Sequence, residues 1–109
     1  MNKIRFIANA VRWFDKVNGN TYHSVRVTRC KDGAIVYGQF QYGYGEGYRD
    51  TALRAMAEAG WIPTKYHAKP GFNSNLNMWE RENNYPIDWN VHEGLKRDCI
   101  ANGKQLSRQ

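Results

Sequence analysis

Three histidines and two cysteines are the residues best suited to bind a metal ion or to act as a nucleophile: His23, His67, His92, Cys30 and Cys99. None of them has the close spacing that is typical of zinc sites or of C-x-x-C motifs. His92 and Cys99 could share one face of a helix, but two ligands do not make a zinc site. No local signature supports a cysteine–histidine hydrolase either. The sequence therefore predicts no metal site and no cofactor, with Cys99 as a small core residue.

The acidic residues do not form the tight cluster that a metal-dependent nuclease usually needs. Glu80 and Glu82 alternate on an expected strand, while Asp88 and Glu93 flank an expected helix start, where capping explains them. We therefore expect a protein that binds rather than one that catalyses. A small nuclease or another hydrolase is the distant alternative.

Three alternating glycines, Gly43, Gly45 and Gly47, lie between an expected strand and an expected helix. Successive backbone N–H groups at such a position could hold a phosphate. The stretch lacks both the G-x-G-x-x-G of a dinucleotide site and the Gly-Lys-Ser/Thr of a P-loop. Glu46 and Asp50 also bring negative charge there. The glycines are thus a weak anion-binding candidate, and a tight turn is the alternative.

The net charge of +6 is unevenly distributed along the 109 residues. Residues 1–31 contain seven lysines and arginines but only one acidic residue, Asp15, so the whole excess lies in the first third. Such asymmetry is typical of a surface that contacts nucleic acid or an acidic protein. A solubilising surface is the alternative explanation.

Two turn signals separate the expected strands that carry most of these charges. Residues 4–17, 20–30 and 34–42 are rich in strand-forming side chains, and Asn18-Gly19 and Asp32-Gly33 separate them. Asn-Gly and Asp-Gly favour type I′ hairpin turns, in which both central residues have positive φ. The sequence therefore predicts three antiparallel strands connected as a β-meander.

Alternation along these strands predicts one core face and one polar, basic and aromatic face. The core face carries Val25, Val27, Val36, Phe40 and Tyr42; Arg12 would also fall on it unless a bulge near residues 8–12 intervenes. The opposite face is the predicted binding surface for nucleic acid or a partner, with Arg5, Lys16 and Lys31 at its margins and with Trp13, Tyr22, Arg26 and Tyr37 at its centre. Rings stack on bases and cations contact phosphates, although the same residue types are enriched in protein interfaces. Residues 61–90 could instead cover these rings as a second layer.

The rest of the chain predicts helices and an irregular connection. Tyr48, Ala52, Leu53 and Met56 recur at helical spacing before Gly60, and this helix would cover the core face of the meander. An irregular stretch over 61–75, a short hairpin of 76–81 with 85–89, and a helix over 91–102 follow, the last with Asn90 as its N-cap. We therefore expect one α+β domain over residues 1–109, with a helix packed on one face of a three-stranded meander.

Composition also bears on location. The chain has no apolar run long enough to span a bilayer, and Met1 to Val11 is too polar for a signal-peptide core. Cys30 and Cys99 lie far apart, as expected for free thiols in a reducing compartment. We expect a cytoplasmic protein without a membrane partner, in which the exposed edge of the third strand could pair two chains.

Three segments carry a resemblance: Trp13 to Val25 (WFDKVNGNTYHSV), Gln41 to Gly45 (QYGYG) and Gly94 to Asp98 (GLKRD). In these the chain resembles short accessory proteins of phages and other mobile elements, a group to which we can attach no activity. The resemblance implies a protein that acts by binding in the host cytoplasm, as inhibitors of host defence such as anti-CRISPR proteins do. The expected partner is a nucleic acid or a host nucleoprotein complex. A protein-only inhibitor or adaptor that occludes a host protein surface is the alternative.

Overall fold

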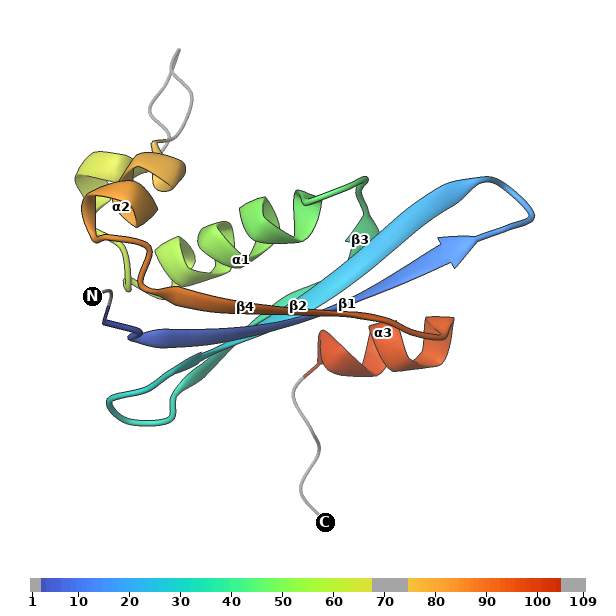
Figure 1. The fold of residues 1–109 in the computed structure, drawn as a ribbon, viewed down its shortest axis with the longest axis horizontal. Helices are drawn as coiled ribbons and strands as arrows, with labels where there is room; N and C mark the ends of the chain where they lie inside the picture. The colour runs from blue at the N-terminus through green and yellow to red at the C-terminus, as the bar shows by residue number, and fades with distance from the viewer. Residues whose placement is uncertain (1–2, 68–74, 105–109) are drawn as a thin grey trace.

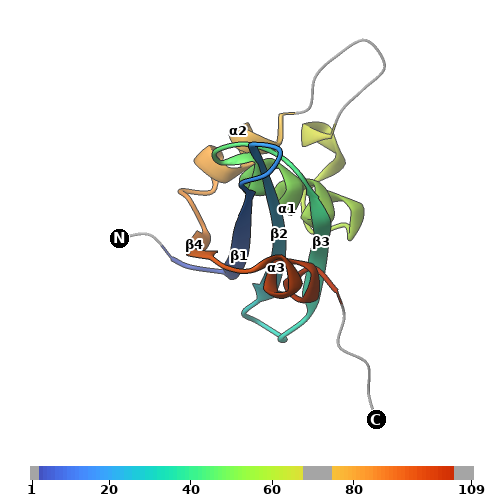
Figure 2. The same cartoon turned by 90° about the vertical axis from the view of Figure 1, so that its right-hand side faces the viewer.

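The computed structural model describes residues 3–67 and 75–104, which form a four-stranded sheet with helices on both faces. The elements in chain order are β1 (Phe6–Asp15), β2 (Asn20–Arg29), β3 (Ile35–Tyr42), α1 (Gly47–Glu58), the 3₁₀ helix η1 (Thr64–Tyr66), α2 (Leu76–Glu82), β4 (Ile87–Glu93) and α3 (Lys96–Asn102). The strand order is β3-β2-β1-β4, with β1, β2 and β3 antiparallel and β4 parallel to β1. Helix α1 lies on one face of the sheet and α3 on the other (Figures 1 and 2). The predicted α+β class and the meander are confirmed.

Both predicted hairpin turns are present, but their type differs from the prediction. The β1–β2 loop has four residues and the β2–β3 loop has five, and in each only the glycine is left-handed, with φ of 69° at Gly19 and 75° at Gly33. The preceding aspartates stabilise the loops, because Asp15 Oδ1 accepts from the Val17 amide and Asp32 Oδ1 from the Ala34 amide. A type I′ turn would need two left-handed residues. The glycine and the Asx bond are therefore what close these loops.

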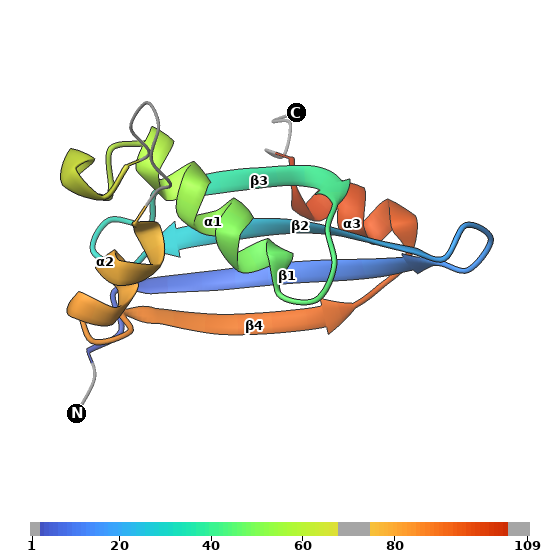
Figure 3. The same ribbon diagram turned by 90° about the horizontal axis from the view of Figure 1, so that it is seen from above.

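The hydrophobic core lies between the sheet and the layer of α1, η1 and α2 (Figure 3). The sheet contributes small residues and one large ring; its buried side chains include Phe6, Ala8, Ala10, Val25 and Val27. Leu53 and Met56 of α1 pack on them, as the helical spacing predicts. Helix α1 ends as predicted at Gly60, where the Gly60 amide donates to Ala57 and the Trp61 amide to Met56.

The predictions for the C-terminal third are wrong in two places. Residues 76–82 form the helix α2 instead of a hairpin strand, because Leu76, Trp79 and Glu80 lie on one helical stripe and are all buried. The expected helix over 91–102 begins only at Lys96, since β4 continues to Glu93 alongside β1. The end of that helix before Gly103 is confirmed. The irregular connection predicted for 61–75 contains η1, and its residues 68–74 lie outside the described residues.

The register of the meander also corrects the prediction. Strand β1 pairs with β2 without interruption, so the bulge expected near residues 8–12 is absent there. Arg12 does lie on the α1 side, where its guanidinium pairs with Glu93 and donates to the Gly45 carbonyl. The irregularity lies instead between β2 and β3, at His23 and Val25. Because one extra residue reverses the faces, Phe40 and Tyr42 lie on the α3 side and not in the core.

No helix in the described part of the chain is long and apolar enough to cross a membrane.

Candidate nucleic-acid interface

A row of five aromatic side chains, here called the aromatic strip, crosses the α3 side of the sheet at the end that carries the β1–β2 loop. The strip consists of Trp13, Tyr22, Phe40, Tyr42 and Tyr44. Ring centroids are 5.5 Å apart for Trp13 and Tyr22, and 5.0 Å apart for the stacked rings of Tyr22 and Phe40. Tyr42 meets Tyr22 edge to face at 5.8 Å and Tyr44 at 5.1 Å. The strip is therefore one continuous surface of contacting rings.

Strand register explains why these rings meet. Trp13 and Tyr22 are direct partners across β1 and β2, and Tyr22 and Tyr42 are partners across β2 and β3. The bulge adds Phe40 to the same side. Tyr44 follows β3, and its hydroxyl lies 3.4 Å from Asn20 Oδ1. Sequence alternation identified only Trp13 and Tyr22, although Gly38 inside β3 was a signal that a bulge could occur there.

Exposure is greatest at one end of the strip. Tyr42 is 52% and Tyr44 57% exposed, while Trp13, Tyr22 and Phe40 are half-buried against each other. The Tyr44 hydroxyl beside Tyr42 raises the pKa of that phenol, so Tyr42 stays neutral at physiological pH. Tyr42 and Tyr44 thus offer the free ring surface, and the other three rings support them.

Lysine and arginine side chains border the strip at the start of α3. Lys96 Nζ lies 5.5 Å from the Trp13 ring centroid, a cation–π contact. Its neighbour Arg97 and the loop residue Lys16 are exposed, and none of these three has an ion pair with a described carboxylate. Asp15 is engaged by its own loop, where a hydrogen bond from the Asn18 side chain lowers the pKa of its carboxyl group. A cation that could meet a phosphate therefore adjoins the Trp13 end of the strip, opposite the exposed pair Tyr42 and Tyr44.

Arg26 and Tyr37, predicted at the centre of the binding surface, are placed beside α3 instead. Arg26 Nε donates to the carbonyl of Asn102 at 3.1 Å, and its Nη2 lies 3.4 Å from the carbonyls of Ala101 and Lys104. Its guanidinium also lies 5.3 Å from the Tyr37 ring centroid. The last carbonyls of a helix lack partners within the helix, and a cation there also meets the negative end of its dipole. Arg26 therefore holds the C-terminal end of α3 on the sheet.

Helix α3 covers the middle of this face, and the described part of residues 61–90 does not form the second layer that was the alternative for these rings. Helices α1 and α2 and the 3₁₀ helix η1 lie on the opposite side of the sheet (Figure 1). The contacts of α3 are polar as well as apolar: the Ser24 hydroxyl donates to the Cys99 carbonyl, and Asn102 Nδ2 donates to the Asn9 carbonyl at 3.0 Å. The aromatic strip remains accessible beyond the N-terminal end of α3.

The three cations predicted at the margins fall at opposite ends of the sheet. Lys16 follows β1, while Arg5 precedes β1 and Lys31 follows β2. Ten strand residues at about 3.3 Å each separate the two ends by roughly 30 Å. The single basic surface expected from the sequence is therefore two surfaces, and only Lys16 lies near the aromatic strip.

The glycines of the predicted anion site serve packing and hydrogen bonding within the protein. The amides of Gly43 and Gly47 donate to the carbonyls of Thr21 and Tyr44. A Cβ at Gly43 would lie 2.5 Å from the ring of His23, so only glycine fits there. The anion-binding prediction gains no support from this hydrogen bonding and stays a prediction.

The residues considered for catalysis are dispersed. In residues 3–67 and 75–104, no three His, Cys, Asp or Glu side chains lie together as metal ligands. Both cysteines are free; Cys30 is exposed, whereas Cys99 is buried and its burial raises the pKa of the thiol. His23 is buried, and its Nε2 lies 2.7 Å from Thr51 Oγ1. His23 and Cys99 therefore occupy the positions of structural side chains.

Comparison with protein-family models, with curated proteins and with solved structures finds no match to this chain. The surfaces described above are therefore the basis for inferring a function.

Proposed function

We propose that this protein is a non-enzymatic binding protein that holds single-stranded nucleic acid, free or within a host nucleoprotein complex, on the aromatic strip. The observation that carries the proposal is the pair of half-exposed rings, Tyr42 and Tyr44, backed by three contacting rings, with Lys96 over Trp13 at the other end of the strip. Aromatic rings that cluster in such number usually lie in a hydrophobic core. Here they gather on a surface that no described helix covers.

Energetics favour a nucleic-acid ligand for such a surface. Stacking of a base on an aromatic side chain contributes about 1–3 kcal/mol, and it needs no particular sequence. Strands of a sheet lie about 4.8 Å apart, so a strip across three strands has room for roughly two or three bases. Lys16, Lys96 and Arg97 are placed to meet phosphates of the same strand. Three such contacts would give a salt dependence of about −2 in log affinity against log salt concentration.

The resemblance to phage accessory proteins supports a target inside the host cell. A phage-encoded protein of this kind would act against a host nucleoprotein complex, as an anti-CRISPR inhibitor does. Binding of exposed single-stranded nucleic acid within such a complex would be one way to block it. The aromatic strip would supply the binding surface for such a target.

A protein partner is the second candidate, and a specific observation favours it. The end of the sheet near the strip carries exposed apolar side chains: Val17 is 91% and Phe14 51% exposed, and Leu95 is also more than half exposed. Apolar groups of this kind add nothing to phosphate binding but suit a protein interface. In this case the protein would occlude a host protein surface without contacting nucleic acid.

The test is fluorescence anisotropy with a labelled single-stranded oligonucleotide of about 12 residues, a typical site size for such proteins. We expect Tyr42→Ala with Tyr44→Ala to weaken binding by at least about tenfold, the equivalent of one lost stacking contact. Phe14→Ala is the matched control, because this ring is equally exposed but lies on the opposite face. Lys96→Ala should weaken binding, whereas Lys65→Ala, which removes a similar cation over Tyr66, should not.

Salt and nuclease treatment separate the two candidates. A fourfold rise in salt concentration should weaken nucleic-acid binding by about twentyfold if three phosphates are contacted. Affinity capture from host lysate should lose its partner after nuclease treatment. Absence of any anisotropy change at low salt, together with capture of one host protein that survives nuclease, would overturn the nucleic-acid proposal in favour of the protein partner.

A further inference from the structure

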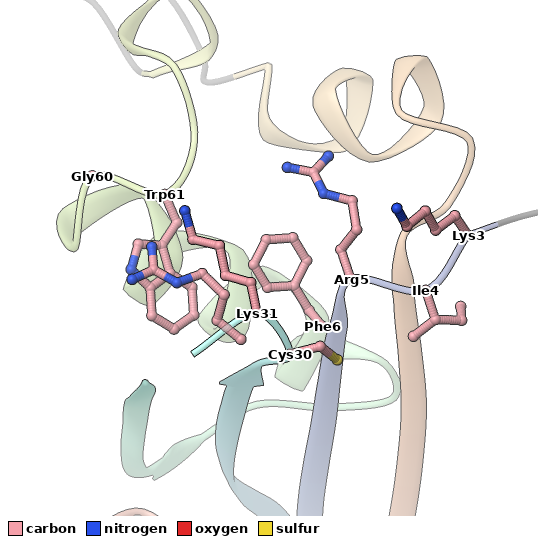
Figure 4. Close-up of a pocket in the computed structure, with 9 residues that line it drawn as sticks. Lys3, Ile4, Arg5, Phe6, Cys30, Lys31, Gly60 and Trp61 are labelled. Atoms are coloured by element: carbon pink, nitrogen blue, oxygen red, sulfur yellow. The ribbon is translucent and has the colours of Figure 1, made fainter. Parts of the chain in front are cut away.

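A second basic surface, far from the aromatic strip, forms a pocket at the end of the sheet where β1 begins. The pocket has a volume of about 570 Å³ and is lined by Lys3, Ile4, Arg5, Phe6, Arg29, Cys30, Lys31, Gly60 and Trp61. This volume lies in the range of roughly 300–1,000 Å³ that is usual for small-molecule sites. Figure 4 shows the Arg5 and Lys31 side chains extending on either side of the Phe6 ring.

Backbone hydrogen bonds fix the pocket walls relative to one another. The Cys30 amide donates to the Arg5 carbonyl at 2.9 Å, which continues the β1–β2 ladder beyond the strands. The Arg5 amide in turn donates to the Pro86 carbonyl at 2.8 Å. Trp61 is placed by the end of α1, where its amide donates to Met56. Three separate parts of the chain thus converge on one rigid frame.

The charge of the pocket is positive and only partly compensated. Arg29 is neutralised by Asp32, whose carboxylate lies 2.7 Å away and whose pKa the guanidinium lowers to about 2. In the described part of the chain, Lys3, Arg5 and Lys31 have no carboxylate within ion-pair distance. The Arg5 guanidinium donates to the neutral Asn83 Oδ1, at 3.2 Å, and this bond orients it. Three uncompensated cations therefore border the pocket.

The floor of the pocket is aromatic. Its accessible ring is that of Trp61, which stacks on the buried ring of Phe6 with centroids 5.7 Å apart and an angle of 22° between their planes. Arg29 lies 4.7 Å from the Trp61 ring centroid, so its guanidinium extends this flat surface. An inorganic anion would use the cations but not the floor. A ligand that uses both must join a phosphate to a flat organic group.

We propose that this pocket binds a nucleotide through its terminal phosphate, with Arg5 and Lys31 on the phosphate and the base or sugar against Trp61 and the Arg29 guanidinium that lies over it. The ligand can come from two sources, a free nucleotide or the 5′-phosphorylated end of a nucleic-acid strand. The site does not depend on the aromatic strip, because the two lie at opposite ends of the sheet. A nucleotide meets both demands of the pocket, since its phosphate is anionic and its base is flat and weakly polar.

The test is isothermal titration calorimetry of the full chain with ADP, pyrophosphate and adenosine as separate probes. ADP should bind more tightly than either fragment, because only ADP reaches both the cations and the floor. A second arm compares one short oligonucleotide with and without a 5′-phosphate. Preference for the phosphorylated form, without binding of ADP, would identify the strand end as the source.

Variants locate the binding. Arg5→Ala with Lys31→Ala should weaken the binding of the preferred probe by about tenfold or more, as expected for lost charge-assisted hydrogen bonds. Lys65→Ala with Lys104→Ala, which removes the same charge elsewhere, should leave it within about twofold. Lys31 lies in an exposed loop, so Lys31→Glu is a second test that should leave the protein folded. Tyr42→Ala with Tyr44→Ala should leave this site intact, so failure of one proposal does not imply failure of the other.

Three results would overturn the proposal. The first is no binding of ADP and no effect of the 5′-phosphate at millimolar concentration. The second is pyrophosphate binding as tightly as ADP, since the aromatic floor would then have no role. The third is binding that the Arg5 and Lys31 variants leave unchanged.

Discussion

Replacing Arg26 with methionine should loosen α3 from the sheet without removing a nucleic-acid contact. In the folded protein the Arg26 guanidinium meets three carbonyls at the end of α3 and stacks near Tyr37. Methionine keeps the apolar stem of the side chain and loses the charge and the donors. The change therefore tests whether Arg26 positions α3, as the structure indicates, or contacts the ligand, as the sequence pattern predicts.

The expected loss of stability follows from these contacts. The Nε bond to Asn102 has ordinary length, and a bond from a charged donor contributes about 1.5 kcal/mol or more. The two bonds at 3.4 Å are long and contribute less, while the helix dipole and the ring contact add roughly 0.5 kcal/mol each. We expect Arg26→Met to lower the free energy of unfolding by about 2.5 kcal/mol or slightly more. Arg26→Lys should lose about half of that, because lysine keeps the charge but not the planar donor group.

Urea denaturation measures the change in unfolding free energy, and hydrogen exchange shows where the structure opens. The amides of α3 should exchange faster in Arg26→Met, while those of β1 and β2 change only with global stability. Oligonucleotide affinity should fall less than in the Tyr42→Ala, Tyr44→Ala variant. A variant of unchanged stability that loses nucleic-acid affinity as strongly as the tyrosine variant would show that Arg26 is a contact residue and that this reasoning is wrong.

Three further predictions concern packing and pH. Gly103→Ala should destabilise the protein by about 1–3 kcal/mol in urea denaturation, because the new Cβ would lie 2.9 Å from the Gly38 carbonyl oxygen; wild-type stability would contradict the close approach of α3 to the sheet. Burial lowers the pKa of His23, so below about pH 6.5 this side chain binds more protons in the unfolded protein than in the folded one. The free energy of unfolding should therefore fall as the pH is lowered, by up to about 1.4 kcal/mol per pH unit, until the pH reaches the lowered pKa of the folded protein. A pH scan of stability checks this, with His23→Gln expected to flatten the profile and the exposed control His92→Gln expected to keep it. Glu80→Ala should cost about 2–3 kcal/mol in thermal or urea denaturation, since buried Glu80 accepts from Arg49 and from Trp89 Nε1; a loss below about 0.5 kcal/mol would count against that buried network.

The meander and one of its faces could be predicted from the sequence because the signals are local. Gly19 and Gly33 close the two loops, and alternation along β1 and β2 correctly places Trp13 and Tyr22 on the same face as Arg26. The face of Phe40 and Tyr42 was predicted wrongly, because a single bulge reverses every later side chain of a strand. Phe40 and Tyr42, two of the five rings of the aromatic strip, owe their face to that one irregularity.

The C-terminal third was harder because its structure depends on distant pairing. Strand β4 pairs with β1, about 80 residues earlier in the chain. The alternation of Ile87, Trp89 and Val91 is a local strand signal, but the helix-start pattern at Asn90 competed with it. The role of Arg26 could not be predicted either. Its partners are backbone carbonyls of α3, which any sequence at the end of that helix would present.

The most direct measurement of the central claim is an NMR titration that follows the indole N–H signals of the four tryptophans. Addition of a single-stranded oligonucleotide should shift the Trp13 signal most, together with the backbone amides of Tyr42 and Tyr44, because these residues belong to the aromatic strip. Trp79 lies in the core and should not respond. Saturable binding that leaves Trp13 and both tyrosines unshifted, with changes confined to Trp61 at the opposite end of the sheet, would contradict the account.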